Sequence, residues 1–506
     1  MYDCYTSGYY QFCSSTDLEN FTFVKNTATS GSFTPRHGTV IPITQSEMEA
    51  LMKAYPTTGL QAGIYTMTHP AIRQDLATIS GTTIQIPVAP GTDLTNFDPQ
   101  FIPEPGTTIA PQGAYDFSQG AVTLTATAGS SIRRYKVTAF PCANPVLPDF
   151  HADPEVLFSR KTRRFYIYPT TDGYPGWGGY SFDVFSSPDL VNFQNEGTIL
   201  DLSAGGDAPW ASGNAWAPCI EERYIDGQWK YYYFFSAHNP KLGVKTLGVA
   251  VADSPTGPFH ASDKPLFTST SGGQMIDSDV FTDPVSGKTY LYYGNGKLHY
   301  RLLADDLMSV KGQEYDITPS GGTLQTYAFR EGVNVFYRDG LYYFLWSVDD
   351  TGAQNYHVAY GTSTSPRGPI KVASKPIVII QDPANKIYGT GHNSIINIPG
   401  TDDWYIVYHR INQNYLSNGP GYHREVCIDR LTFADDGTIN QVTPTHEGIT
   451  PVDVSGLIDN PETDAIIQPS VTTPPPTGIY DLQGRKLQSP PKKGLYIING
   501  RKIFRR

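Results

Sequence analysis

One aromatic pattern recurs five times along the chain, as RRFYIYP (163–169), WKYYYFF (229–235), KTYLYYG (288–294), LYYFLWS (341–347) and DWYIVYH (403–409). Most copies follow a turn signal such as Asp226-Gly227 or Asp339-Gly340. Because Tyr, Phe and Val favour strands, each copy is expected to be a β-strand. Five similar strands at roughly even spacing predict a repeat architecture.

Two further elements accompany the aromatic strand in most repeats. An alternating strand that runs into a Pro-containing turn follows it, as at 180–193, 247–259 and 357–370. Another strand precedes it, as HADPEVLF (151–158), AWAPCIEE (215–222), MIDSDVFTD (275–283), REGVNVFYRD (330–339) and GHNSIINI (391–398). Five units, each with room for four strands, predict a five-bladed β-propeller over residues 147–450.

Composition agrees with an all-β protein. The chain has 506 residues, enough for several domains, and 34 of them are Tyr. Its 48 Gly and 40 Pro argue against a helical bundle, and its aromatic content argues against disorder. Residues 62–142 alternate polar and β-branched side chains, which predicts a small Ig-like β-sandwich before the propeller.

Charge and cysteine content exclude several classes of protein. A net charge of −11 argues against a nucleic-acid partner, although residues 485–506 hold eight Lys or Arg and no acid. Five Cys without a CxxC motif support neither a metal cluster nor a disulfide framework. No apolar run is long enough to span a membrane.

Candidate catalytic residues begin the strand that precedes each aromatic strand. This strand is expected to line the central channel, so its first residues should meet at one mouth. In chain order they are Asp153, Trp216, Asp277, Glu331 and His392. Carboxylates held close together raise one another's pKa, which costs stability unless the arrangement is used. Glycoside hydrolysis uses such a pair, one as acid and one as base or nucleophile, and a third carboxylate can raise the pKa of the acid.

The mouth motifs resemble those of glycoside hydrolase family 43. HADP (151–154), AWAP (215–218), MIDSDVF (275–281), REG (330–332), GTGHNSI (389–395) and YHR (408–410) carry the likeness through all five repeats. The resemblance implies an inverting enzyme for arabinose- and xylose-containing plant polysaccharides. It implies Asp153 as the general base, Asp277 as the residue that orients the acid and tunes its pKa, and Glu331 as the general acid.

The same resemblance implies roles for two further residues, and the ring of a third suits a sugar. Arg410 would contact the innermost sugar, and His392 would lie at the channel centre, often near a cation. No cofactor is implied, but a Ca²⁺ ion at the centre is left open. The flat ring of Trp216 suits stacking on a sugar. The alternatives are a structural salt bridge for Arg410 and a hydrogen-bonded core histidine for His392.

Two motifs depart from the family pattern. Gly332-Val333 follows Glu331 where Pro is usual, and Ser278-Asp279 follows Asp277 where Pro-Ser is usual. Because alternation along a strand places Asp277 and Asp279 on one face, the two can be confused.

The substrate is less closely defined than the reaction. Exo-acting α-L-arabinofuranosidase ranks first and β-xylosidase second. Residues 201–214, with Trp210, are expected to wall off one end of the channel, which favours exo action. An endo-arabinanase or β-galactosidase of the same fold remains an alternative. A carbohydrate-binding propeller without catalysis is the rival from another class.

The chain ends carry separate predictions. CSSTDLENF (13–21) parallels FSSPDLVNF (185–193), so residues 1–45 are interpreted as the end of a truncated glycosidase-like module. Residues 459–477 are a Pro/Thr-rich linker. Residues 478–506 resemble a type IX secretion sorting domain. A secreted, periplasmic or cell-surface bacterial protein is therefore expected, although no N-terminal signal peptide is visible.

Overall fold

The computed structural model describes residues 61–456 apart from Asp75 and 417–420, together with short strands near both ends. Nearly all of its regular structure is β, and the described residues form only three 3-10 helices, Pro175–Trp177, Pro383–Asn385 and Gln413–Tyr415. No helix in this part of the chain has the length and apolar character needed to cross a membrane. The all-β class expected from the sequence is confirmed.

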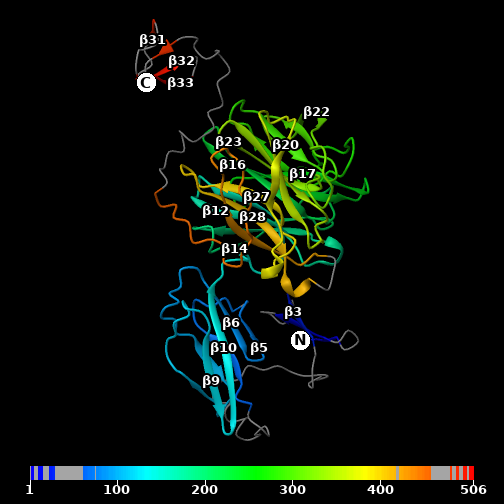
Figure 1. The fold of residues 1–506 in the computed structure, drawn as a ribbon. Helices are drawn as coiled ribbons and strands as arrows, with labels where there is room; N and C mark the ends of the chain where they lie inside the picture. Colours follow the sequence, from blue (N-terminus) through cyan, green and yellow to red (C-terminus); the bar gives the residue numbers. More distant parts are fainter. Residues whose placement is uncertain are drawn as a thin grey trace. The chain divides into compact units, whose positions relative to one another are not determined.

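The larger of two compact units, residues 87–92 and 140–506, contains five antiparallel sheets in chain order (Figure 1). The sheets are β11 (His151–Ser159), β12 (Arg164–Thr171), β13 (Ser181–Ser187) and β14 (Gln194–Asp201); β15 (Trp216–Ile225), β16 (Gln228–Asn239), β17 (Val244–Ala252) and β18 (His260–Ala261); β19 (Asp279–Thr282), β20 (Thr289–Tyr293), β21 (His299–Leu303) and β22 (Val310–Asp316); β23 (Glu331–Arg338), β24 (Leu341–Val348), β25 (His357–Ser363) and β26 (Lys371–Ile379); and β27 (Gly391–Asn397), β28 (Trp404–Ile411) and β29 (Arg424–Leu431). First strands of successive sheets contact one another, and β27 contacts β11, so the ring is closed. This is the predicted five-bladed propeller.

The fifth blade has three strands, and the segment before β11 lies beside its outer strand. The Val146 N–H donates to the Val426 carbonyl at 2.8 Å. The Asn144 side chain accepts from the Ile428 N–H at 2.8 Å and donates to the Ile428 carbonyl at 3.1 Å. The two ends of the propeller are therefore hydrogen-bonded to each other, which closes the ring.

Each innermost strand has a left-handed residue at the channel mouth. These residues, which we call the mouth ring, are Asp153, Ala217, Asp277, Gly332 and His392, with φ from 40° to 60°. Such backbone is uncommon outside glycine and persists where the surroundings hold it. In four blades the N–H of this residue donates to a second-strand side chain of the preceding blade: His409 for Asp153, Thr170 for Ala217, Ser236 for Asp277 and Ser347 for His392.

A second ring lies two residues further along the same strands. Its members are Glu155, Cys219, Asp279, Asn334 and Ser394. In four cases the side chain accepts a backbone N–H of the next blade: Glu155 from Ile220, Cys219 from Val280, Asp279 from Val335 and Ser394 from Val156. These bonds satisfy strand donors that face the neighbouring blade, and so link the blades.

The smaller unit, which includes residues 93–139, holds two sheets. One has the order β5 (Thr78–Ser80), β6 (Thr83–Val88), β10 (Ser131–Pro141), β9 (Val122–Ala128) and β8 (Thr108–Ala110), and the other pairs β4 (Ile64–Thr68) with β7 (Gln100–Pro103). The Tyr135 hydroxyl joins them, since it accepts from the Ile64 N–H and donates to the Ala62 carbonyl, both at 3.2 Å. This is the expected Ig-like sandwich.

The chain ends are described only as strands. β1 (Tyr2–Cys4), β2 (Tyr9–Ser14) and β3 (Thr22–Ala28) form one antiparallel sheet. β31 (Lys486–Leu487), β30 (Ile479–Tyr480), β32 (Gly494–Ile498) and β33 (Arg501–Arg505) form another, in that order. The interpretation of residues 1–45 as part of a glycosidase-like module and of 459–477 as a linker lies outside the described residues.

Candidate active site

A pocket of about 270 Å³ opens at the mouth of the propeller channel. Its lining comes from all five blades and consists of Asp153, Trp177, Trp216, Lys245, Gln274, Ile276, Asp277, Asn295, Arg330, Glu331, Asp350, Thr351, His392 and Arg424. Five of the six residues expected from the sequence, all except Arg410, are among them. The propeller therefore brings together side chains that are far apart in the chain.

Asp153 is a buried carboxylate that stays ionised. Its Oδ1 lies 3.0 Å from Arg424 Nη1 and 3.2 Å from Nδ1 of both His392 and His409. Burial alone would raise the pKa of Asp153, but the Arg424 guanidinium and the His392 ring hold it well below its usual range. An ionised, buried carboxylate beside an open pocket can accept a proton.

Glu331 and Asp277 are shifted in the opposite direction. Burial raises the pKa of Glu331 to about 7, although the Tyr356 hydroxyl donates to its Oε1 at 3.0 Å and favours the ionised form. Asn295 donates to the other oxygen. Burial is the main cause that raises the pKa of Asp277 well above its usual value, and the negative charge of Glu331 adds to it. The two carboxyls therefore retain a proton near neutral pH.

The structure separates Asp277 from Asp279. Asp277 precedes β19 and lines the pocket, whereas Asp279 begins β19 and lies in the second ring. Its Oδ2 accepts the Val335 N–H at 3.0 Å and its Oδ1 accepts from Asn334 at 3.2 Å. Asp279 does not line the pocket, so Asp277 is the aspartate available to a substrate.

His392 lies beside Asp153 at the mouth, and burial lowers its pKa, so the ring is neutral at pH 7. Within the described part of the chain, no three His, Cys, Asp or Glu side chains are grouped to hold a metal ion. Asp153 already has Arg424 at 3.0 Å. The side chains around His392 and Asp153 therefore do not fit a Ca²⁺ ion held by protein ligands, and the proposed mechanism uses no such ion.

Trp216 lines the pocket with one face already occupied. Lys245 Nζ lies 4.6 Å from the ring centroid, a cation–π contact, and the indole N–H donates to the Trp177 carbonyl at 2.7 Å. A sugar can therefore stack on one face at most. Lys245 could not be predicted in the same way, because it lies near the start of the third strand of its blade and only first strands are expected to line the channel.

Arg410 points away from the pocket. Its Nε donates to Glu425 Oε1 at 2.7 Å and its Nη1 to the Thr445 carbonyl at 3.2 Å. Alternation along β28 explains this, because the neighbouring His409 faces Asp153. The expected contact of Arg410 with a sugar is therefore wrong, and the alternative, a structural salt bridge, is what the structure shows.

Arg424 occupies the pocket position that Arg410 was expected to fill. It begins β29, and its Nε lies 2.8 Å from Asp172 Oδ2 while its Nη1 lies 3.0 Å from Asp153. Its guanidinium also lies over the Trp177 ring, 4.8 Å from the centroid. Its place at the start of a strand was the available signal, but Arg424 lies outside the motifs that carry the family resemblance.

Residues 201–214 do not wall the pocket, contrary to expectation. Trp210 stacks on Phe235 at 5.9 Å in blade 2, and its indole N–H donates to the Ser262 carbonyl at 3.1 Å. The wall on this side is Trp177, from the loop between β12 and β13. Its carbonyl accepts from Asn214 at 3.1 Å as well as from Trp216, which fixes the loop.

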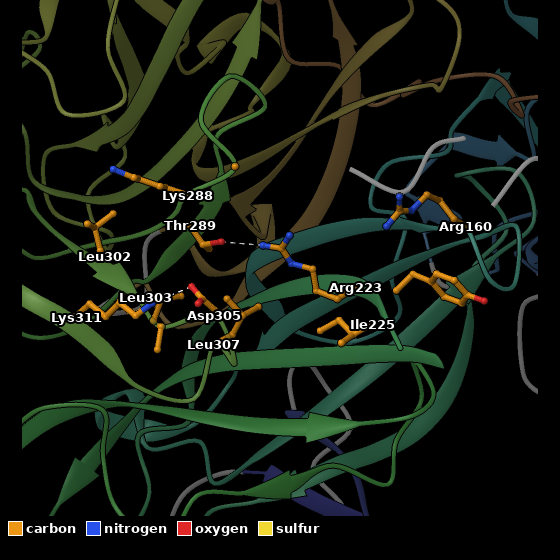
Figure 2. A pocket seen from close by; sticks show the side chains of 13 residues that line it. Arg160, Arg223, Ile225, Lys288, Thr289, Leu302, Leu303, Asp305, Leu307 and Lys311 are labelled. Atoms are coloured by element: carbon orange, nitrogen blue, oxygen red, sulfur yellow. Dashed lines mark hydrogen bonds and ion pairs between the residues drawn. The ribbon is translucent and has the colours of Figure 1, made fainter. Parts of the chain in front are cut away.

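A second cavity, of about 240 Å³, lies at the other end of β15 (Figure 2). Its lining includes Ile225, the last residue of that strand, whereas Trp216, the first, lines the mouth pocket. Three of its four cations form ion pairs: Arg160 with Glu222 at 3.0 Å, Arg223 with Glu221 at 3.0 Å and Lys311 with Asp305 at 2.8 Å. It holds no carboxyl pair comparable to that of the mouth.

Known proteins resemble this chain mainly over the propeller. The model of SGBP, N-terminal, matches residues 68–139. A β-D-galactofuranosidase (xynD) of Aspergillus niger is 36% identical over 325 residues, which cover 60% of this chain and 86% of the relative. An arabinoxylan arabinofuranohydrolase of Paenibacillus polymyxa is 28% identical, over 58% of this chain and 48% of the relative.

Solved structures agree with the sequence relatives. A thermostable family-43 glycoside hydrolase matches with a TM-score of 0.53 and 27% identity, over 61% of this chain and 98% of that one. A β-xylosidase/α-arabinofuranosidase from a compost metagenome, solved with xylotriose in a calcium-free form, matches with a TM-score of 0.50, 26% identity and coverage of 60% and 97%. The model of glycosyl hydrolases family 43 matches residues 142–439, which is more than half of the chain. The chain belongs to glycosyl hydrolase family 43 and is a glycosidase.

Proposed function

We propose that the chain is an inverting α-L-arabinofuranosidase for arabinose- and xylose-containing plant polysaccharides, with β-xylosidase activity as the next choice. The observation that carries the proposal is the set of three buried carboxyls in one pocket, one with a lowered pKa and two with raised pKa values. Relatives named arabinofuranohydrolase and xylosidase/arabinosidase support the sugar class.

In the proposed mechanism Asp153 is the base and Glu331 the acid. Asp153 takes a proton from a water molecule as its oxygen attacks the anomeric carbon. The glycosidic C–O bond breaks, and Glu331 gives its proton to the departing oxygen. Asp277 orients Glu331. Arg424 keeps Asp153 ionised and so ready to act.

Inversion makes a geometric and a stereochemical prediction. Room for the water requires the two carboxyls to be roughly 6.5–9.5 Å apart, with Asp277 nearer to Glu331 than Asp153 is. NMR of the first-formed sugar should find the anomer opposite to that of the substrate. Retention of configuration would reject the assigned roles.

A β-D-galactofuranosidase is a further candidate after β-xylosidase, favoured by the 36% identical relative. α-L-Arabinofuranose and β-D-galactofuranose share their ring configuration and differ in the length of the exocyclic group. Release of 4-nitrophenol from a panel of aryl glycosides decides between them. We expect the arabinofuranoside to react fastest. A galactofuranoside, xylopyranoside or galactopyranoside in first place would name the corresponding alternative.

Two outcomes fall outside this set. Cleavage of internal bonds in arabinan, with oligosaccharides as the first products, would indicate an endo-arabinanase. No turnover of any glycoside would indicate a carbohydrate-binding propeller.

We further propose that the protein acts outside the cytoplasm, as its polymeric substrate requires, with residues 478–506 as the export signal. Fractionation of cells with and without these residues tests that.

A further inference from the structure

An aromatic surface leads out of the pocket on the side of Trp177. Its members, which we call the aromatic rim, are Phe150, Trp177, Tyr415, Tyr422 and His423. Ring centroids lie 5.8 Å apart for Trp177–Tyr422, 4.7 Å for Tyr422–His423, 3.8 Å for Tyr415–His423, 5.3 Å for Phe150–Tyr415 and 5.0 Å for Phe150–His423. Three separate loops therefore contribute rings to one continuous surface.

The rim does not belong to the propeller core. All five side chains are partly exposed, and none is a member of the clusters of buried apolar residues. Within the described residues, neither the Tyr415 nor the Tyr422 hydroxyl has a protein partner. Partly exposed aromatic rings with free hydroxyls at the edge of a pocket are typical of ligand contact rather than packing.

The backbone holds the rim in place. The Gly173 N–H donates to the Tyr422 carbonyl at 2.7 Å, and the Asp172 N–H donates to the Phe150 carbonyl at 3.0 Å. Gly173 has φ +91°, and a Cβ there would lie 3.0 Å from the Phe150 ring, so a glycine is needed for this approach. Because the surface is formed in advance, binding to it loses little conformational entropy.

Charge narrows the class of ligand. None of the five side chains is charged at pH 7, because burial lowers the pKa of His423, the only titratable ring near neutrality. The nearby Arg424 and Asp172 are paired with each other at 2.8 Å. The rim therefore offers flat apolar faces and hydroxyl donors without net charge, which suits a neutral sugar chain better than a uronate chain or a peptide.

We propose that the aromatic rim binds the neutral main chain of a polysaccharide whose side-chain sugar enters the pocket. This inference rests on the proposed function, because it places the leaving-group side of the substrate on the rim. With the main chain bound on the rim, the enzyme would remove branches from a polymer rather than release sugars from the ends of short oligosaccharides.

The test compares a polymer with a small substrate. Tyr422→Ala should lower kcat/KM on arabinoxylan about tenfold, the size of one or two aromatic contacts, and change kcat/KM on an aryl arabinofuranoside less than about twofold. Tyr422→Phe should keep most of the polymer activity. Tyr224→Ala, at a Tyr that is 39% exposed and lines the second cavity, is the matched control and should change neither.

Binding measurements keep the two proposals apart. In a Glu331→Gln background, arabinoxylan should retard the protein in a native affinity gel, Tyr422→Ala should remove most of the retardation, and added salt should not. Equal losses on polymer and aryl substrate, no loss on either, or retardation that salt abolishes would overturn the rim proposal. If no aryl glycoside is hydrolysed but Tyr422→Ala still abolishes retardation, the proposed function fails and the rim stands.

Discussion

In two blades the mouth ring and the second ring both carry a carboxyl on the same first strand, and the two carboxyls serve different ends. Asp277 and Asp279 lie two residues apart, as do Asp153 and Glu155. At the mouth, Asp153 and Asp277 face an open pocket and interact with other ionisable side chains, although Asp277 also accepts the Gly332 N–H. In the second ring, Glu155 and Asp279 accept backbone N–H groups of the next blade.

The difference shows what makes a buried carboxyl functional in a propeller. A carboxyl whose lone pairs are used by backbone donors links strands and has little left for a substrate. A carboxyl beside an open cavity can exchange protons, and its neighbours set its pKa. The same substitution should therefore affect activity at the mouth and stability in the second ring.

The largest effect is expected for the base. Asp153→Asn should lower kcat on every substrate by roughly 10²- to 10⁴-fold, because water activation is needed whatever the leaving group. Asp279→Asn is the matched control, since it makes the same chemical change in the second ring, and it should leave kcat within about threefold. Steady-state kinetics on one aryl and one natural substrate would measure both. Similar losses for the two variants would remove the distinction between the rings.

Glu331→Gln should discriminate between leaving groups. Natural glycosides leave as alkoxides that need a proton, so a loss of roughly 10²- to 10⁴-fold is expected with them. An aryl glycoside with a good leaving group should lose at least about tenfold less, because a phenolate departs with little help. Parallel kinetics on the two substrates give the answer, and equal losses would reject Glu331 as the acid.

The pH profile of the native enzyme should have an alkaline limb set by the acid. Glu331 works in its protonated form and its pKa is raised to about 7, so kcat/KM on a natural substrate should fall as pH rises above about 7. Asp153 stays ionised far below that pH, so the base does not limit activity on this side. Glu331→Gln should remove the limb. A limb that persists unchanged in this variant would assign it to another group.

The fold was predictable because its signal is local and repeated. Each aromatic strand and its turn are contiguous in sequence, and five copies indicate the ring. Closure of the ring was not predictable, because it depends on hydrogen bonds between Asn144 and Ile428, which lie far apart in the chain. Nothing in the sequence around Asn144 marks it as a substitute for a strand.

The site was predictable only where it lies on first strands. Asp153, Asp277, Glu331 and His392 were found through their place at strand entrances. Trp177, Lys245 and Arg424 come from a loop or from later strands, and reach the pocket only through tertiary structure.

The equivalence of positions among the blades was also predicted incompletely. Left-handed backbone makes Ala217 and Gly332 the counterparts of Asp153, so Trp216 and Glu331 lie one residue earlier. A one-residue offset of this kind follows from backbone conformation, which alternation of residue types does not reveal.

The smallest effect on activity, and a distinct effect on stability, is expected for Asp279. Burial raises its pKa to about 8 from 3.8, so between these pH values the folded protein holds a proton that the unfolded chain has released. Its contribution to the free energy of unfolding is then fully present below about pH 4 and is lost as pH rises through about 8. Asp279→Asn has no such proton to lose. The stability of the variant relative to the native protein should therefore rise between about pH 4 and about pH 8, by up to about 1.4 kcal/mol per pH unit. Asp279→Ala also leaves the Val335 N–H without its acceptor, which should cost about 1–3 kcal/mol at any pH. Urea unfolding of the three proteins across this range measures both terms. A stability difference between the native protein and Asp279→Asn that does not change with pH would mean that Asp279 is ionised in the folded protein. The second ring would then hold an ionised carboxylate, as the mouth does at Asp153.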